Sequence, residues 1–116
     1  MAKGYIPGRR DIIWLDFEPR RGNEIGKYRP ALVLSSEEYN SATGLLICCP
    51  ISTSIRGAAT EVKVTGLDKP SAVVANKIHT LAWRARGARK IRKARKAEFA
   101  ETLHKLLPLI GAEEVL

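Results

Sequence analysis

The sequence is poor in the residues that build metal centres, disulfide frameworks and membrane spans. It holds two cysteines and two histidines, which form no cluster, so we expect no metal site and no cofactor. The cysteines, Cys48 and Cys49, are neighbours in the chain. A bridge between neighbours is strained, so we expect reduced thiols that point to opposite faces of a strand. No apolar run approaches the length of a transmembrane helix.

The first seven residues also lack the apolar core of a signal peptide. We therefore expect a cytoplasmic protein that does not associate with a membrane. The chain has 116 residues, of which 45% are hydrophobic and 28% charged. That length suits one hydrophobic core rather than two, which predicts a single domain over residues 1–116.

Acidic residues are missing from a long stretch of the chain. The segment from Lys69 to Ala97 contains none, yet it holds ten of the twenty lysines and arginines, and the net charge is +8. Such a block indicates a polyanionic partner, most often nucleic acid. A solvated basic face is the commoner origin of a lone charge run, so charge alone does not decide the function.

Hydrophobic patterning predicts several short strands and one late helix. The strands are expected at residues 11–17, 31–34, 45–49, 60–64 and 72–75, with an extended segment at 81–87 that places Arg84 and Arg86 on one side. One capped helical turn is expected at 35–40, and a helix over 97–110 that bends or ends near Pro108. We therefore expect a mainly β fold, a small curled antiparallel sheet or barrel with a C-terminal helix laid on it.

Arg29 is the residue around which a site is expected. It precedes Pro30 and is therefore held extended, at the mouth of a buried strand, where a guanidinium is suited to bind an anion. The next strand leads into Pro50 and then into hydroxyl residues. If the two strands pair as a hairpin, the hydroxyls of Ser52 and Thr53 come near Arg29.

Several motifs occur in an order that resembles the MazF/PemK toxin family, and its MazF branch most closely. They are Asp11-Ile12-Ile13-Trp14-Leu15-Asp16-Phe17-Glu18-Pro19, Gly22 and Glu24, Arg29-Pro30-Ala31-Leu32-Val33-Leu34-Ser35, Tyr39-Asn40, Thr43-Gly44, Pro50-Ile51-Ser52-Thr53 and Trp83-Arg84-Ala85-Arg86-Gly87. The resemblance covers about residues 5–87. It implies an SH3-like barrel that works as a homodimer.

The resemblance also implies a function. Such a chain is the toxin of a type II toxin–antitoxin pair, an endoribonuclease that cuts single-stranded RNA, mRNA above all, at short sequences and so inhibits translation and growth. The 2′-hydroxyl of the RNA is the nucleophile, the products carry 2′,3′-cyclic phosphate and 5′-hydroxyl ends, and no metal takes part. A cognate antitoxin with an acidic C-terminal segment is expected to lie across the RNA groove.

The resemblance assigns catalytic roles to a few positions. Arg29 matches the family's catalytic arginine, and Ser52 stands where threonine is common, with Thr53 as the alternative hydroxyl. Glu24 matches a loop carboxylate that accepts a proton or holds the loop. Asn76 departs from a carboxylate found in relatives, and an amide cannot be a general base at neutral pH.

The expected RNA-binding residues combine cations with rings, as single-strand sites do. Among them Trp83 is the expected stacking residue, whereas Trp14 is expected in the core. His79 either contacts phosphate or is a plain surface histidine, and the basic run 89–96 supplies nonspecific attraction. The full set is Phe17, Lys27, Arg56, Asn76, Lys77, His79, Trp83, Arg84 and Arg86.

Two other function classes stay open at this point. A toxin of the same fold inhibits DNA gyrase by binding, without catalysis, and a pure RNA-binding module is the second alternative. Arg29 together with Ser52 favours cleavage, because a binding inhibitor does not need that pair. An RNA-binding module would tolerate the loss of either residue.

Overall fold

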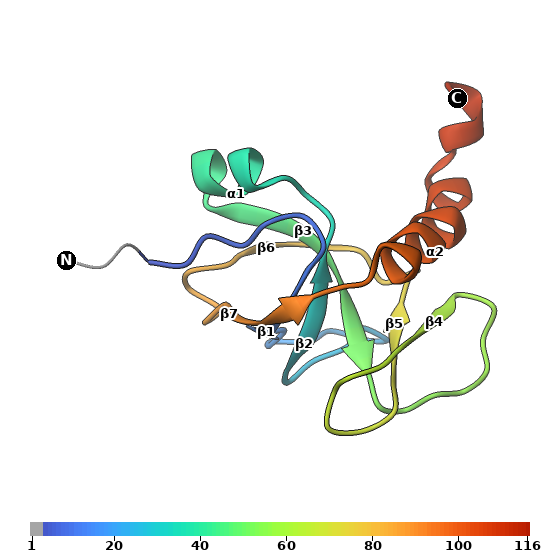
Figure 1. Cartoon of the computed structure of the whole chain (residues 1–116), viewed down its shortest axis with the longest axis horizontal. Helices are drawn as coiled ribbons and strands as arrows, with labels where there is room; N and C mark the ends of the chain where they lie inside the picture. The colour runs from blue at the N-terminus through green and yellow to red at the C-terminus, as the bar shows by residue number, and fades with distance from the viewer. Residues whose placement is uncertain (1–3) are drawn as a thin grey trace.

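One curled antiparallel sheet with a helix against it makes up the fold of the computed structural model, which describes residues 4–116 (Figure 1). The first three residues, on which part of the signal-peptide expectation depends, lie outside that range. Within the described range the strands are β1 (Asp11–Asp16), β2 (Tyr28–Val33), β3 (Leu45–Ser52), β4 (Glu61–Val64), β5 (Ser71–Val74), β6 (His79–Ala82) and β7 (Arg89–Lys93). The helices are α1 (Glu37–Thr43), α2 (Lys96–Leu106) and the 3₁₀ turns η1 (Leu107–Ile110) and η2 (Ala112–Glu114). The predicted fold class, mainly β with a C-terminal helix, is confirmed.

Strand β3 is the centre of the sheet, whose order is β4-β5-β3-β2-β1-β7, with β6 also pairing β3. Its first half pairs with β6 over Leu45–Cys48, and its end pairs with β5 at Ile51 and Ser52. Pro50, where the sequence indicated the end of this strand, lies between those two pairings. The missing N–H of proline is tolerated at such an interruption of a ladder.

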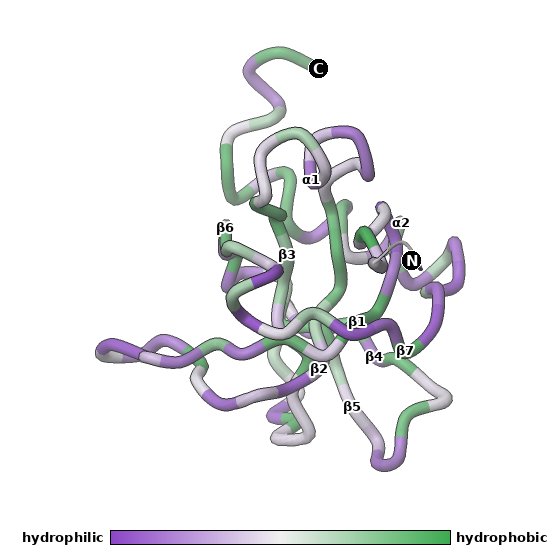
Figure 2. Tube along the Cα trace, turned by 90° about the vertical axis from the view of Figure 1, so that its left-hand side faces the viewer, coloured by the Kyte–Doolittle hydropathy of each residue, from purple (hydrophilic) through white to green (hydrophobic). Residues whose placement is uncertain are grey.

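The alternation of side chains along the strands builds a core on each face of the sheet. One core combines Ile12, Leu32 and Cys49 with Phe99, Leu103 and Leu106 from the C-terminal helix. The other combines Ile13, Leu15, Ala31, Cys48 and Trp83. Cys48 and Cys49 therefore enter opposite cores as free thiols, as predicted. The path of β3 is mostly hydrophobic, whereas the loops that project from the sheet are mostly hydrophilic (Figure 2).

Both helices differ in length from the prediction. Helix α1 has two turns rather than one: the Ser36 hydroxyl accepts a hydrogen bond from Tyr39 N at 3.2 Å, and Gly44, at φ 72°, closes the helix. Only glycine adopts that left-handed conformation without strain. The second helix ends at Leu106, and Pro108 stands in the first turn of η1, so the predicted bend near Pro108 is confirmed.

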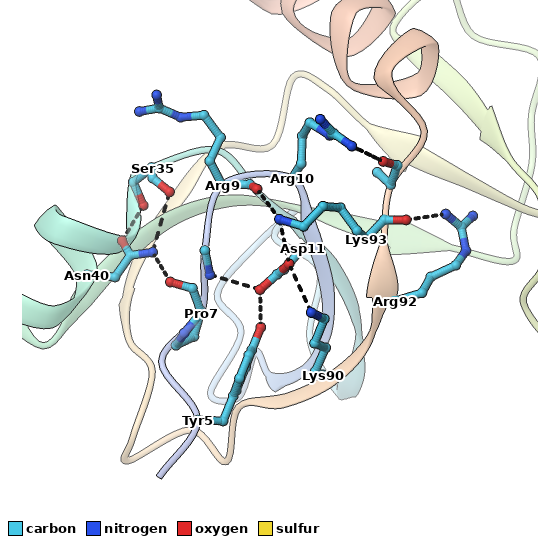
Figure 3. Close-up of polar contacts among 12 residues, drawn as sticks. Tyr5, Pro7, Arg9, Arg10, Asp11, Ser35, Asn40, Lys90, Arg92 and Lys93 are labelled. Carbon is cyan, nitrogen blue, oxygen red and sulfur yellow. Dashed lines mark hydrogen bonds and ion pairs between the residues drawn. The ribbon is translucent and has the colours of Figure 1, made fainter. Parts of the chain in front are cut away.

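The basic run 89–96 contains a strand that the sequence did not indicate. Strand β7 pairs with β1 at the edge of the sheet, and two buried carboxylates offset its charge. Asp11 Oδ1 lies 3.2 Å from Lys93 Nζ and 3.8 Å from Lys90 Nζ, and Glu98 pairs with Arg92 at 3.4 Å. The same Asp11 carboxylate accepts hydrogen bonds from the hydroxyl of Tyr5 and from Gly8 N (Figure 3). This run therefore has a structural role.

Candidate active site

A cavity of about 930 Å³ opens where three loops meet at one end of the sheet. These loops join β1 to β2, β3 to β4 and β5 to β6. The walls include many of the residues predicted from the sequence: Glu24, Lys27, Arg29, Ser52, Arg56, Asn76 and Lys77. The folding of the sheet thus gathers a set of cations, hydroxyls and carboxylates from distant parts of the sequence.

Arg29 is half-buried at the start of β2 and is held by its Nε atom, which donates to Gly26 O at 2.7 Å. Among the described residues, Nη1 and Nη2 have no hydrogen-bond acceptor, which leaves this fork of donors for a ligand. Burial lowers the pKa of Arg29, and the nearby Glu18 carboxylate opposes the shift. The side chain remains a cation at neutral pH.

Ser52 lines the same cavity as Arg29. Strands β2 and β3 pair as far as Ala31 and Pro50, and beyond that point β3 pairs with β5, where Ser52 is opposite Ala72. The Ser52 hydroxyl oxygen accepts from Ser54 N at 3.0 Å, which leaves its proton free to be donated. Thr53 does not line the cavity. Of the two predicted hydroxyls, Ser52 is therefore the one that shares the cavity wall with Arg29.

The β1–β2 loop is braced by its own carboxylates. Glu24 Oε1 accepts from Arg21 N at 2.8 Å. Glu18, which sequence reasoning missed, accepts from Arg20 N at 3.2 Å and from Lys27 N at 2.6 Å, and so ties together the two ends of the loop. Lys27 has a positive φ of 73°, a backbone conformation that residues other than glycine rarely adopt. The hydrogen bond from its amide to Glu18 stabilises this conformation. The only signal for Glu18 was an acidic residue at the start of a polar loop.

The remaining cavity residues come from the other two loops. Asn76 and Lys77 stand in the β5–β6 loop, and the Lys77 ammonium donates to Asn23 O in the β1–β2 loop. Arg56 is exposed in the β3–β4 loop. Glu61, which sequence reasoning also missed, lines the cavity at the end of that loop.

Two aromatic predictions are wrong in their placement. Trp83 is only 4% exposed, and its Nε1 donates to Asn40 O at 2.9 Å, so its ring packs the core and is not presented to a ligand. Trp14, expected in the core, is half-buried and stacks on Tyr28 with ring centroids 5.5 Å apart. Phe17 is also buried, with the His79 ring edge-on at 5.2 Å.

The arginines that follow Trp83 do not share a strand face, because residues 83–87 form a turn. Arg84 places its guanidinium 4.1 Å from the centroid of the Trp83 ring. Arg86 Nη1 donates to Asp16 O at 3.0 Å and to Glu18 O at 2.8 Å, and so fixes the end of β1. Together with His79, whose Nδ1 lies 3.0 Å from Lys77 O, they stand outside the cavity wall.

Within residues 4–116, no group of three or more His, Cys, Asp or Glu side chains is arranged to hold a metal ion. Across the same residues, every helix is too short or too polar to cross a bilayer.

Comparison with known proteins gives one consistent result. A model of the family described as PemK-like, MazF-like toxin of type II toxin–antitoxin system matches residues 8–110. The chain is 41% identical over 90 residues to the endoribonuclease toxin MazF of Escherichia coli K12, which covers 78% of this chain and 81% of the relative.

Solved structures agree with the sequence comparison. The crystal structure of MazF from Deinococcus radiodurans superposes with a TM-score of 0.89 at 38% identity, over 93% of this chain and 99% of that one. A MazE–MazF structure from the same organism gives 0.80 at 35% identity, over 93% and 99% of the two chains. With the fold, the cavity and these matches together, the chain belongs to the family of PemK-like and MazF-like toxins of type II toxin–antitoxin systems.

Proposed function

We propose that this chain acts as an endoribonuclease toxin that cuts single-stranded RNA in the cavity containing Arg29 and Ser52. The observation that supports the proposal is the shared wall of one open cavity, which contains the Arg29 guanidinium, with free Nη donors, and the Ser52 hydroxyl. The 41% identity to an endoribonuclease toxin supports the same activity. Single-stranded RNA suits the site because its unpaired bases can leave the stack and reach the polar groups of a cavity wall, whereas a duplex keeps its bases paired.

The chemistry expected here is an in-line transesterification. The RNA 2′-hydroxyl oxygen bonds to the adjacent phosphorus, and the bond from phosphorus to the 5′ oxygen breaks. The leaving 5′ oxygen takes up a proton from water, so the products are a 2′,3′-cyclic phosphate and a 5′-hydroxyl. Negative charge builds on the phosphate oxygens, and the Arg29 fork stabilises it with two charge-assisted hydrogen bonds. Ser52 donates a third hydrogen bond to the same phosphate.

A proton must leave the 2′-hydroxyl, and a carboxylate is the group suited to accept it. Glu24 is the proposed acceptor, because among the carboxylates that residues 4–116 bring to the cavity wall it accepts a single hydrogen bond, from Arg21 N to Oε1, and so keeps Oε2 free. Asn76, an amide in the same wall, is proposed to bind RNA by hydrogen bonds rather than to act as a base. Lys27, Arg56 and Lys77 are proposed to contact the RNA phosphates.

The partners are proposed on the same grounds. Solved MazE–MazF structures of Deinococcus radiodurans, at 35% identity, support a cognate antitoxin. We propose that an acidic C-terminal segment of that antitoxin covers the cationic cavity and excludes RNA. A homodimer is also proposed, and the exposed side chains of Leu109 and Ile110 near the C-terminus, 55% and 63% exposed, support an apolar contact.

Cleavage of a long mixed-sequence RNA in EDTA tests the proposal, with Arg29→Ala as the test variant. Arg9→Ala is the matched control, since it removes the same charge from an exposed side chain outside the cavity. The expected result is discrete cuts by the wild type and by Arg9→Ala, and none by a folded Arg29→Ala protein. Equal cleavage by Arg29→Ala would overturn the assignment. A folded wild type without activity would overturn the proposal, and inhibition of gyrase would be tested next.

A further inference from the structure

The β3–β4 loop, residues 53–60, is folded around one carboxylate that the mechanism above does not use. Three consecutive backbone N–H groups converge on the side chain of Glu61. Arg56 N donates to Oε2 at 3.0 Å, and Gly57 N and Ala58 N donate to Oε1 at 2.8 and 3.1 Å. Gly57, at φ 74°, supplies the left-handed residue that lets successive N–H groups face one acceptor.

These bonds act on the charge of Glu61. The N–H of Arg56 first, and those of Gly57 and Ala58 after it, lower the pKa of the Glu61 carboxyl below its ordinary value. The group is therefore ionised at neutral pH, and the contacts are hydrogen bonds to a charged acceptor, the stronger kind.

The backbone of Glu61 is held from the opposite direction by the C-terminal helix. Lys105 Nζ donates to the carbonyl oxygen of Glu61 at 2.7 Å, and Lys105 in turn pairs with Glu101 at 3.3 Å. Glu61 N also donates to Ala58 O at 3.1 Å. Because the backbone of Glu61 is fixed in this way, its carboxylate can hold the N–H groups of the β3–β4 loop in one conformation.

In this loop conformation, every second side chain of the β3–β4 loop lines the proposed RNA site. Alternate residues line the cavity, beginning at Ser52 and continuing through Ser54, Arg56, Ala58 and Thr60. Arg56 is the one cation of this series and is exposed. Its amide is the first of the three donors to Glu61, so the carboxylate fixes the backbone from which the guanidinium extends.

We infer that Glu61 is a positioning residue for RNA binding: it holds residues 56–58 so that Arg56 meets a phosphate of the bound strand. This inference rests on the proposed endoribonuclease function and names a determinant of substrate binding in the same cavity. Glu61 touches neither the reacting phosphate nor the 2′-hydroxyl. Its loss therefore raises KM for RNA and leaves kcat within about twofold.

If Glu61 acted only through its charge, its loss would lower KM for RNA rather than raise it. The direction of the change in KM therefore tests the inference. Removing a carboxylate from the wall of an RNA site raises the positive potential and, on electrostatics alone, strengthens RNA binding. Glu61→Gln removes the same charge but also replaces one acceptor oxygen with an NH₂ group that faces backbone donors. The inference predicts that KM rises about tenfold, the cost of losing one phosphate contact.

Three companion variants separate position from charge. Glu38→Gln, in the exposed first turn of α1, removes one negative charge outside the cavity and is expected to leave KM unchanged or lower it slightly. Glu61→Asp keeps the charge and withdraws it by one methylene, so it should raise KM as well. In an Arg56→Ala background, Glu61→Gln should add no further increase, because the residue through which it acts is gone.

The measurements are KM and kcat on a short RNA, the salt dependence of binding to a non-cleavable 2′-deoxy analogue, and thermal unfolding as a check of the fold. The slope of log affinity against log salt should become shallower by about 0.7 in Glu61→Gln, the loss of one single-strand phosphate contact. Additive effects of Glu61→Gln and Arg56→Ala, or tighter binding by Glu61→Gln, would overturn the inference. Inactivity of the wild type itself would instead overturn the proposed function.

Discussion

The Asp11 carboxylate is buried between strands β1 and β7, and replacing it with asparagine tests how the edge strand β7 is held. Asp11 is 3% exposed and joins the N-terminal segment, β1 and β7. Its partners are the Tyr5 hydroxyl and Gly8 N, which donate to Oδ2, and the ammonium groups of Lys90 and Lys93 beside Oδ1 (Figure 3).

The magnitude of the Asp11→Asn effect follows from these contacts. A hydrogen bond to a charged acceptor contributes about 1.5–3 kcal/mol to stability. In Asp11→Asn, an NH₂ group replaces one carboxylate oxygen and faces hydrogen-bond donors, so the bonds on that side are lost. The two lysines are about half exposed, so each ion pair adds only about 0.2–1 kcal/mol. We therefore expect a loss of about 3 kcal/mol in the free energy of unfolding, a fall in Tm of roughly 15 °C for a chain of this size.

Chemical and thermal denaturation of wild type, Asp11→Asn and the exposed control Glu113→Gln measure the effect. The control should stay within about 0.5 kcal/mol of wild type. An Asp11→Asn protein equally close to wild type would refute this account of β7.

The Asp11 effect should also depend on pH. Burial raises the pKa of Asp11, but the bonds from Tyr5 and Gly8 and the Lys93 ammonium outweigh it, so the native pKa lies below the ordinary value of 3.8. The unfolded chain then binds the proton more readily than the native protein. The stabilisation is fully present above the ordinary pKa and is lost as the pH falls through the native one. The difference in the free energy of unfolding between wild type and Asp11→Asn should therefore become smaller in acid.

Three further predictions test other parts of the structure. Trp83→Phe removes the hydrogen bond to Asn40 O and should lower the unfolding free energy by about 1–2 kcal/mol. The Kd for RNA should stay unchanged because the ring is buried. Weaker RNA binding at unchanged stability would instead show that Trp83 stacks on RNA. Burial raises the pKa of the Cys48 thiol and raises that of Cys49 to about 12, so neither should react with a thiol reagent at neutral pH until the protein unfolds, and rapid labelling of the native protein would contradict their placement in the two cores. Arg86→Ala frees the carbonyls of Asp16 and Glu18 and should speed amide hydrogen exchange of residues 18–27, whereas the matched exposed variant Arg84→Ala should not.

Much of the fold could be predicted because the alternation of hydrophobic residues and the lengths of the hydrophobic runs indicate where the strands lie and which faces are buried. The run Asp11-Ile12-Ile13-Trp14-Leu15-Asp16 alternates between two cores, and the adjacent cysteines fall on opposite faces for the same reason. Strands β2 and β3 also pair with each other, as their lengths predicted, and Arg29 and Ser52 line one cavity at the end of the sheet.

The missed features depend on contacts that are distant in sequence. Strand β7 was hidden because its charges look solvated until Asp11 and Glu98 are placed beside them. Trp83 followed by arginines suggested a stacking site, but its indole meets Asn40 O from a helix about forty residues earlier. Glu18 and Glu61 bind backbone N–H groups of folded loops, and no residue type in the sequence indicates which amides will converge.

In the proposed reaction, the RNA is cut in the cavity by attack of its own 2′-hydroxyl. The most direct test takes one RNA with a mapped cleavage site and replaces the 2′-hydroxyl at that site alone with hydrogen. We expect that the protein still binds this RNA but no longer cuts it, and that the unmodified RNA yields 2′,3′-cyclic phosphate and 5′-hydroxyl ends. Cleavage of the 2′-deoxy RNA at the same position would show that the 2′-hydroxyl is not the nucleophile.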